Sequence, residues 1–408
     1  MLAPDRDLQR PLWRRLPTLL GPLDWIAVGL LAAGGLCVAT GALSTAAAGD
    51  IMQRVLPLLL FLGTVIVLAE LTAEAEVFDV IATFLARLGR GRYPALFLLC
   101  VGFAALTTAT LNLDTTAVLL TPVMLALARK LRVDPLPLAV TTVWLANTAS
   151  ILLPVSNLTN LLAQQRIGLS PLGFAERMWL PQLAVLLVTM AVLWVAFWRR
   201  ARTVDNRYAV PEPHRPRHRG LYLVAGLACV MFVIAILVQV QLGVASAVAA
   251  AIVVVGFVVV DRGPLRWKLI PWRLLVMVTG LFLVMQTVGE HGLDAVARSL
   301  MGSGDGLSGA LRAAGVGAGM SNLVNNLPAY VAGEAVVLVD NHLQLLALLL
   351  GTNVGPVITP WASLATLLWY ERCRTHGVRI PLVRLVVAGA VLAVSALVTG
   401  VLALVVSR

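Results

Sequence analysis

Two short polar motifs interrupt long apolar stretches of this chain, about two hundred residues apart. The first, residues 110–116, contains Asp114, and the second, residues 321–328, contains three asparagines. Ionisable and amide side chains are costly at membrane depth and persist mainly where they line a path for a substrate or a proton. Interrupted helices that occur in pairs mark the binding site of transporters built from repeats. These motifs therefore predict a buried polar site for a small solute.

A second pair of polar motifs predicts two broken helices. Residues 147–158 align with residues 353–364 at a constant spacing of 206, which pairs Asn147 with Asn353 and Pro154 with Pro360. Proline lacks a backbone donor and clashes with the preceding turn, so we expect the chain to unwind at 149–157 and at 354–360. The motifs around Asp114 and Asn326 align at a spacing near 212. Corresponding spans run in opposite directions, which predicts inverted repeats.

Exposed carbonyls, amides and helix ends of the unwound segments are expected to bind the solute, together with polar side chains of the four motifs. The candidate substrate-binding residues are Asp114, Thr115, Asn147, Ser150, Ser156, Asn157, Asn322, Asn325, Asn326, Asn353, Thr359 and Ser363. Four threonines lie off the aligned motifs and are expected only to bond helix to helix. They are Thr107, Thr108, Thr159 and Thr366.

Two carboxylates are candidates for proton coupling. Asp114 lies at a predicted hairpin tip, and Glu334 lies two turns beyond Asn326. Burial disfavours the charged form of a carboxylate and so raises its pKa toward the range in which it can load and release a proton. None of the five histidines falls in a predicted span, so a histidine relay is not expected. The four cysteines form no Cys-x-x-Cys pair, so we expect no metal site, disulfide frame or other cofactor.

The composition indicates an all-α polytopic membrane protein. Hydrophobic residues make up 59% of the chain, charged residues 12%, and the mean hydropathy is +0.90, far from an average soluble domain. Long apolar runs predict seven plain spans, at about 24–43, 53–71, 178–198, 221–240, 244–260, 274–289 and 383–405. Two crossings near 136–165 and 343–370 are expected to be broken, and 93–131 and 306–339 are expected to form re-entrant hairpins.

The distribution of basic residues predicts the topology. Of the 31 Lys and Arg residues, 25 fall on the side of the N-terminus when the loops are placed alternately, which predicts a cytoplasmic N-terminus and an external C-terminus in the cell membrane. The net charge of +11 comes from cations scattered at span ends, where they contact anionic lipid headgroups, so nucleic acid is not expected as a partner. The predicted division is a basic arm at 1–23, a first repeat at 24–198, an Arg/Pro-rich linker at 199–219 and a second repeat at 220–408.

The motifs resemble those of the arsenical pump membrane proteins, the arsenite efflux permeases of the ion transporter superfamily. The resemblance rests on residues 325–330 with Glu334, on residues 147–150 with 155–158, and on Gly355-Pro356 with residues 359–369. It implies a secondary carrier that exports arsenite and antimonite in exchange for protons. Members of the family are sometimes associated with a cytoplasmic ATPase subunit.

Other functions stay open within the same superfamily. A sodium/proton antiporter would use Asp114 and unwound carbonyls to hold sodium, and an anion or dicarboxylate carrier would require cationic or sodium-binding groups at the hairpin tips. Neither tip contains Lys or Arg. An intramembrane enzyme is not expected, because the chain has no His-Glu-x-x-His pair, no Gly-x-Ser-x-Gly elbow and no phosphate loop.

Overall fold

The protein is built from helices packed side by side and joined by turns. The computed structural model describes residues 22–110, 112–199, 207–238, 240–302, 304 and 306–407, and no named strand occurs among them. Seven described helices are long and apolar enough to cross a membrane, which confirms the predicted all-α polytopic class. Most of the predicted arm at 1–23 and residues 200–206 of the predicted linker lie outside the described residues.

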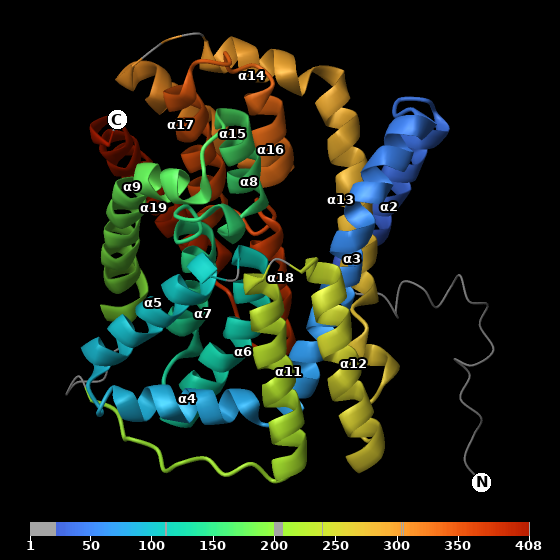
Figure 1. Ribbon diagram of the computed structural model, residues 1–408, viewed down its shortest axis with the longest axis vertical. Coiled ribbons are helices and arrows are strands. Elements are labelled where there is room, and N and C mark those ends of the chain that lie inside the picture. Colours follow the sequence, from blue (N-terminus) through green and yellow to red (C-terminus); the bar gives the residue numbers. More distant parts are fainter. Residues whose placement is uncertain are drawn as a thin grey trace.

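Five helices form a panel at one side of the molecule, on the right in Figure 1. In this panel α2 packs on α13, and α12 packs on both α3 and α11. The members are α2 (Pro22–Ala39), α3 (Thr45–Glu74), α11 (Arg219–Leu237), α12 (Leu242–Val260) and α13 (Trp272–Val288). The panel therefore combines helices from both halves of the chain.

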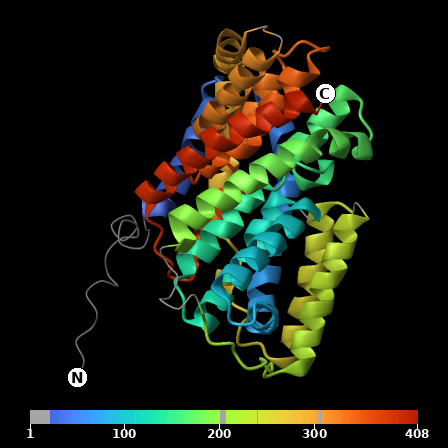
Figure 2. The same cartoon turned by 90° about the vertical axis from the view of Figure 1, so that its left-hand side faces the viewer.

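The remaining long helices form a second group, the hairpin core, on the left in Figure 1. Its first-half members are α5 (Tyr93–Thr110), α6 (Leu113–Leu131), α7 (Pro135–Thr148), α8 (Leu158–Ile167), α9 (Pro171–Leu193) and the π-helical turn η3 (Trp194–Trp198). Its second-half members are α15 (Leu307–Val324), α16 (Asn326–Glu334), α17 (His342–Val354), α18 (Leu364–Thr375) and α19 (Leu382–Val406). Figure 2 shows α9 and α19 crossing this core side by side.

Two short helices lie across the ends of the core. α4 (Val77–Leu88) crosses one end and α14 (Asp294–Met301) crosses the opposite end (Figure 1). The remaining short turns are η2 (Pro154–Ser156), η4 (Trp267–Leu269), η5 (Gly289–Leu293) and η6 (Gly355–Val357). The two ends are called the α4 end and the α14 end below.

The predicted spans agree with the observed helices, with two differences in detail. The first helix, predicted as a full span at 24–43, ends at Ala39, and its apolar part, Ala27–Ala39, is too short to be among the seven. It is followed by a turn at Gly41 with a positive φ, which glycine adopts without strain. The segment Tyr93–Thr110 is long enough to cross a membrane alone, although the sequence predicted one arm of a hairpin. α5 and α6 nevertheless form the predicted hairpin. Its two ends lie on the same side of the core, since Gly91, before α5, and Lys130, near the end of α6, both contact the linker after α9.

That linker, residues 207–218, runs along the α4 end of the core. Tyr208 is anchored there: its backbone N–H donates to Gly91 O at 2.9 Å, and its hydroxyl donates to Ala86 O at 2.6 Å. Burial raises the pKa of the Tyr208 phenol. The Lys130 ammonium has only donors, so it donates to Nδ1 of His214 at 3.2 Å, and Nε2–H of His214 donates to Glu76 at 3.0 Å. The linker therefore ties α4 to the end of α6.

Close packing of backbones fixes the second hairpin against its neighbouring helix. A Cβ added at Gly351 of α17 would lie 2.1 Å from Ala314 O of α15, and one added at Gly317 would lie 2.8 Å from Leu348 O. Small residues allow helices in membranes to approach in this way. Side chains at these two positions would push α15 away from α17.

Two ion pairs join the panel to the hairpin core near the α4 end. The buried Arg372 of α18 donates to the Glu70 carboxylate and to Ile66 O, both on α3. The neighbouring Glu371 lies 3.8 Å from Arg273 of α13. Two consecutive residues of α18, Glu371 and Arg372, thus pair with an arginine and a glutamate of the panel, respectively.

Replacement of Glu70 by Gln should destabilise the protein, because Arg372 would remain buried without its counter-ion. We expect a loss on the order of 2–3 kcal/mol, below that of a fully buried pair since Glu70 is partly exposed. Thermal unfolding in detergent measures the change. Glu74→Gln, one turn further along α3, is the matched control, because no described residue forms an ion pair with Glu74. Equal melting temperatures for the two variants would contradict a stabilising role of the pair.

Candidate functional site

Asparagine forms the junction at each hairpin tip. Asn112 precedes α6 with a φ of 154°, and Asn325 precedes α16 with a φ of 86°. Asparagine tolerates positive φ better than most residues. Asn112 also caps α6, because its Oδ1 accepts a bond from the backbone N–H of Thr115 at 2.8 Å. The two junctions are 213 residues apart, one more than the spacing that paired Asp114 with Asn326 in the sequence.

Both broken helices unwind where the sequence predicted. α7 ends at Thr148 and α8 begins at Leu158, with η2 between them. α17 ends at Val354 and α18 begins at Leu364 after η6, so the second break extends to residue 363, three residues beyond the prediction. Asn157 and Ser363 cap the helices that follow, through bonds from Thr159 N and Thr366 N.

The broken helices of the two halves are joined by Asn353, which is 1% exposed. Its Oδ1 accepts bonds from Asn157 Nδ2 at 2.9 Å and from Thr159 Oγ1 at 2.8 Å. Its Nδ2 donates to Asn160 Oδ1 at 2.8 Å. Every polar atom of the Asn353 side chain therefore bonds to a residue of the first half.

Asn147 makes the corresponding connection from the first half. Its Nδ2 donates to Val143 O at 2.9 Å and to Thr366 Oγ1 at 3.2 Å, and Thr366 also bonds to Ser363. Asn353 follows Asn147 by 206 residues, and Thr366 follows Asn160 by the same number. Thr159 and Thr366 thus bond helix to helix, as expected for residues off the aligned motifs.

The second hairpin tip is bonded to its own broken helix. Asn322 Nδ2 donates to Gly355 O at 2.9 Å, and Asn322 Oδ1 accepts from Thr359 Oγ1 at 2.7 Å. The further contacts are Asn325 Nδ2 to Trp361 O at 3.0 Å, Asn326 N to Ala362 O at 2.8 Å and Trp361 Nε1 to Asn322 O at 2.7 Å. The candidate amides of this tip therefore bond extensively to protein groups.

The first hairpin tip has fewer contacts of this kind. Ser156 Oγ donates to Ala109 O at 2.8 Å, while Ser150 Oγ donates to Asn147 O within its own segment. Five buried side-chain oxygens have no hydrogen-bond partner among the described residues. Two are the hydroxyls of Tyr93 and Tyr330, and the other three are Asp114 Oδ1, Thr115 Oγ1 and Asn147 Oδ1. All three belong to the predicted site residues of the first half. A buried polar group without a partner costs free energy, so a ligand that donates hydrogen bonds would be favoured here.

Glu334 is not part of these tip contacts. It ends α16, at the foot of the second hairpin, and α16 packs on α8 there. The two carboxylates predicted to couple protons therefore occupy different places: Asp114 lies in the first turn of α6 at a hairpin tip.

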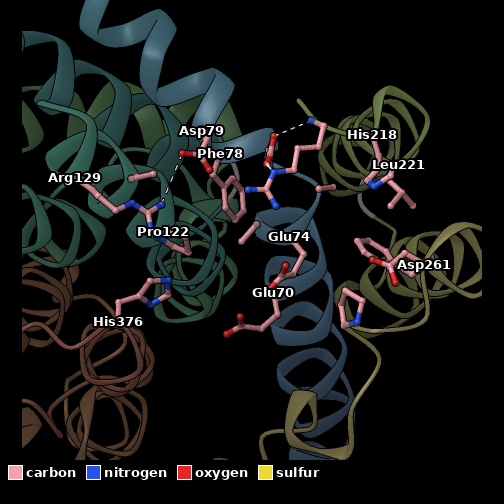
Figure 3. A pocket seen from close by; sticks show the side chains of 17 residues that line it. Glu70, Glu74, Phe78, Asp79, Pro122, Arg129, His218, Leu221, Asp261 and His376 are labelled. Carbon is pink, nitrogen blue, oxygen red and sulfur yellow. Dashed lines mark hydrogen bonds and ion pairs between the residues drawn. The ribbon is translucent and has the colours of Figure 1, made fainter. Parts of the chain in front are cut away.

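A cavity of about 440 Å³ opens between the panel and the core at the α4 end (Figure 3). Glu70 and Glu74 of α3 lie on one side, and Arg129 of α6 faces Asp79 at 3.8 Å on another. Pro122 of α6 also lines the cavity. Pro122 is two helical turns from Asp114, which corresponds to about 12 Å along the axis. The cavity thus reaches α6 as far as Pro122 and does not contain the tip residues.

Sequence reasoning missed two side chains that hold the first unwound segment. Asn160 Nδ2 donates to Ser150 O at 2.6 Å and to Leu153 O at 2.9 Å. Gln182 of α9 accepts from Ile151 N at 3.1 Å and donates to Thr148 O at 3.0 Å. Asn160 could have been found, because it aligns with Thr366 at the spacing of 206. Gln182 had only the weak signal of one amide in an apolar span.

Hairpins, broken helices and buried amides together define a class of polytopic membrane transporters. Residues 19–366 match the model of the citrate transporter family, CitMHS. The match covers more than half of the chain, and the protein belongs to this family.

Curated relatives confirm the resemblance that the motifs indicated. An arsenical pump membrane protein of Escherichia coli is 27% identical over 326 residues, which cover 75% of this chain and 76% of that protein. One from Yersinia enterocolitica is 28% identical over 329 residues, with the same coverage. An uncharacterized transporter of Mycobacterium tuberculosis is 25% identical over 315 residues, 75% of this chain and 71% of its own length. Among solved structures, the Alcanivorax borkumensis YdaH transporter is 14% identical, with a TM-score of 0.45 over 96% of this chain and 98% of that one.

Replacement of Asn353 by Ala should destabilise the protein more than replacement of Asn147 by Ala. The first change removes three bonds and leaves buried groups of Asn157, Thr159 and Asn160 with fewer partners, a loss of about 3 kcal/mol. Asn147→Ala removes one bond between helices and one within α7. Thermal unfolding of both purified variants measures the difference. A smaller loss for Asn353→Ala than for Asn147→Ala would contradict the central role of Asn353 in this network.

Proposed function

We propose that this transporter exports the neutral trivalent hydroxides of arsenic and antimony in exchange for protons. The observation that carries the proposal is the set of three buried oxygens without protein partners: Asp114 Oδ1, Thr115 Oγ1 and Asn147 Oδ1. A carboxylate oxygen and an amide oxygen accept hydrogen bonds, and a hydroxyl can accept or donate. Arsenous acid presents three hydroxyl donors, which suit such a set. The names of the arsenical pump relatives support the same substrate class.

The same oxygens argue against an anionic substrate, although the family model carries the description of a citrate transporter. Recognition of a carboxylate favours Arg, Lys or backbone N–H donors. The tips at 110–116 and 321–328 contain no Lys or Arg. The negative charge of a carboxylate ligand would also be repelled by the carboxylate of Asp114. Citrate or a dicarboxylate is therefore a poorer match than a neutral hydroxide.

Sodium is the second candidate, and the same observation favours it. Hard cations are bound by carboxylate, carbonyl and hydroxyl oxygens, which are the groups that Asp114, Asn147 and Thr115 present. A sodium/proton antiporter would use this site without any arsenic ligand. The two candidates differ in the transported species, so a flux measurement separates them.

In the proposed cycle, solute and proton occupy the first tip in turn. The cavity at the α4 end supplies an approach from that side, which the charge distribution predicts to be cytoplasmic. Asp114 loses its proton and the site accepts the hydroxide, and protonation of Asp114 from the opposite side weakens its acceptor capacity and favours release. Repeats of inverted topology would allow the site to face each side alternately.

Arsenite uptake into everted membrane vesicles with an acidic interior tests the function. We expect uptake that an uncoupler abolishes and that does not require sodium, because the outward proton movement would drive arsenite inward. Vesicles without the protein are the control. Absence of arsenite uptake, together with collapse of the pH gradient on addition of sodium, would reject arsenite and assign the chain as a cation antiporter.

Replacement of Asp114 by Asn should abolish proton-driven arsenite uptake while the protein still inserts in the membrane. The amide keeps the size of the side chain but cannot exchange a proton, so we expect a loss of about 100-fold or more, in the range found for groups that transfer protons. Asp50→Asn, which changes an exposed aspartate of α3, is the matched control. Wild-type uptake by Asp114→Asn would remove Asp114 from the coupling mechanism.

A further inference from the structure

Gln182 is the residue of α9 that fixes the end of the first broken helix. α9 spans Pro171–Leu193, and Gln182 is 7% exposed within it. Its Oε1 accepts from Ile151 N at 3.1 Å, and its Nε2 donates to Thr148 O at 3.0 Å. One side chain therefore holds a carbonyl of the last α7 residue and an N–H of the unwound segment that follows.

The unwound segment needs such partners because a helix end leaves backbone groups without intrahelical bonds. Asn160 supplies donors to Ser150 O and Leu153 O, and Gln182 supplies the bonds at Thr148 and Ile151. The carbonyls of Thr148, Ser150 and Leu153 thus already accept bonds from protein. The backbone of this segment is therefore held by side chains of α8 and α9.

We propose that Gln182 is a positioning residue for the substrate site, since it orients the last turn of α7 and with it the unpartnered Oδ1 of Asn147. Asn147 immediately precedes Thr148, the residue whose carbonyl Gln182 holds. This inference rests on the proposed function, because it assumes that Asn147 contacts the transported hydroxide. Gln182 itself acts through the backbone and does not contact the solute.

The second half holds its unwound segment differently. The residue 206 positions after Gln182 is Ala388, whose side chain cannot form such bonds. At the next position, Gly389 of α19, an added Cβ would lie 2.3 Å from Val357 O. The second segment is therefore packed directly against α19 and is bonded to its own hairpin tip. Gln182 of α9 therefore has no amide counterpart at the aligned position of α19.

Three variants test the role of Gln182. Gln182→Leu removes both bonds. Gln182→Glu keeps the acceptor for Ile151 N but donates to Thr148 O only when the carboxyl group is protonated. Gln344→Leu is the matched control, because Gln344 is a buried amide that donates to a backbone carbonyl, Gly302 O at 2.9 Å, outside the tip contacts.

The first readout is transport of arsenite by the full-length protein in proteoliposomes. Gln182→Leu should raise the apparent KM for arsenite by about tenfold, the factor that corresponds to one lost buried hydrogen bond, with a smaller change in maximal rate. Gln182→Glu should approach the wild-type KM at acidic pH and lose affinity at alkaline pH, when each value is compared with wild type at the same pH. Gln344→Leu should leave KM unchanged.

The second readout does not depend on the substrate. Hydrogen exchange should show that the amide of Ile151 is protected in the wild type and loses protection in Gln182→Leu, but not in Gln344→Leu. Unchanged KM and unchanged exchange in both Gln182 variants would overturn the inference. Faster exchange with an unchanged KM would also overturn it, because the clamp would then not affect the site. Absence of arsenite transport by the wild type would instead reject the proposed function.

Discussion

The requirement that buried backbone groups be hydrogen-bonded governs the centre of this protein. Each broken helix leaves several N–H and C=O groups without helical partners at a depth where water is scarce. Side chains of other helices supply the missing bonds, and Asn160, Gln182 and Asn322 are the main donors. The polar residues of the core therefore have a structural role first, and their atoms without a protein partner are the first candidates for contact with a solute.

The aligned polar motifs of the two halves differ in this respect. In the second half, the amides of Asn322 and Asn353 bond to protein through both their nitrogen and their oxygen atoms. In the first half, Asp114, Thr115 and Asn147 each retain one oxygen without a partner. A sequence comparison that treats aligned motifs as equivalent cannot detect this difference, because both halves carry the same kinds of residues.

The sequence predicted the helical class, the positions of the spans, both hairpins and both breaks, because apolar length and proline act locally. It also identified the asparagines that join the halves. It could not separate ligand-facing amides from structural ones, since that depends on which backbone carbonyl each amide reaches. The bond from Gln182 to Thr148 O joins residues 34 positions apart, and the pair of Glu70 with Arg372 joins residues 302 apart. No local pattern marks either contact.

Under the proposed function, the rigidity of the first unwound segment matters for binding of the solute. A neutral hydroxide loses less hydration energy on burial than an ion does, so a few acceptor oxygens suffice to hold it, provided that they are fixed. A cation would require more oxygens around it, and the carbonyls that could supply them at Thr148, Ser150 and Leu153 already accept bonds from Gln182 and Asn160. A carbonyl oxygen that accepts one hydrogen bond retains a second lone pair, so these bonds do not by themselves exclude sodium. Under the proposed function, one set of hydrogen bonds satisfies the backbone of the broken helix and also fixes the turn that carries Asn147, whose free oxygen would bind the solute.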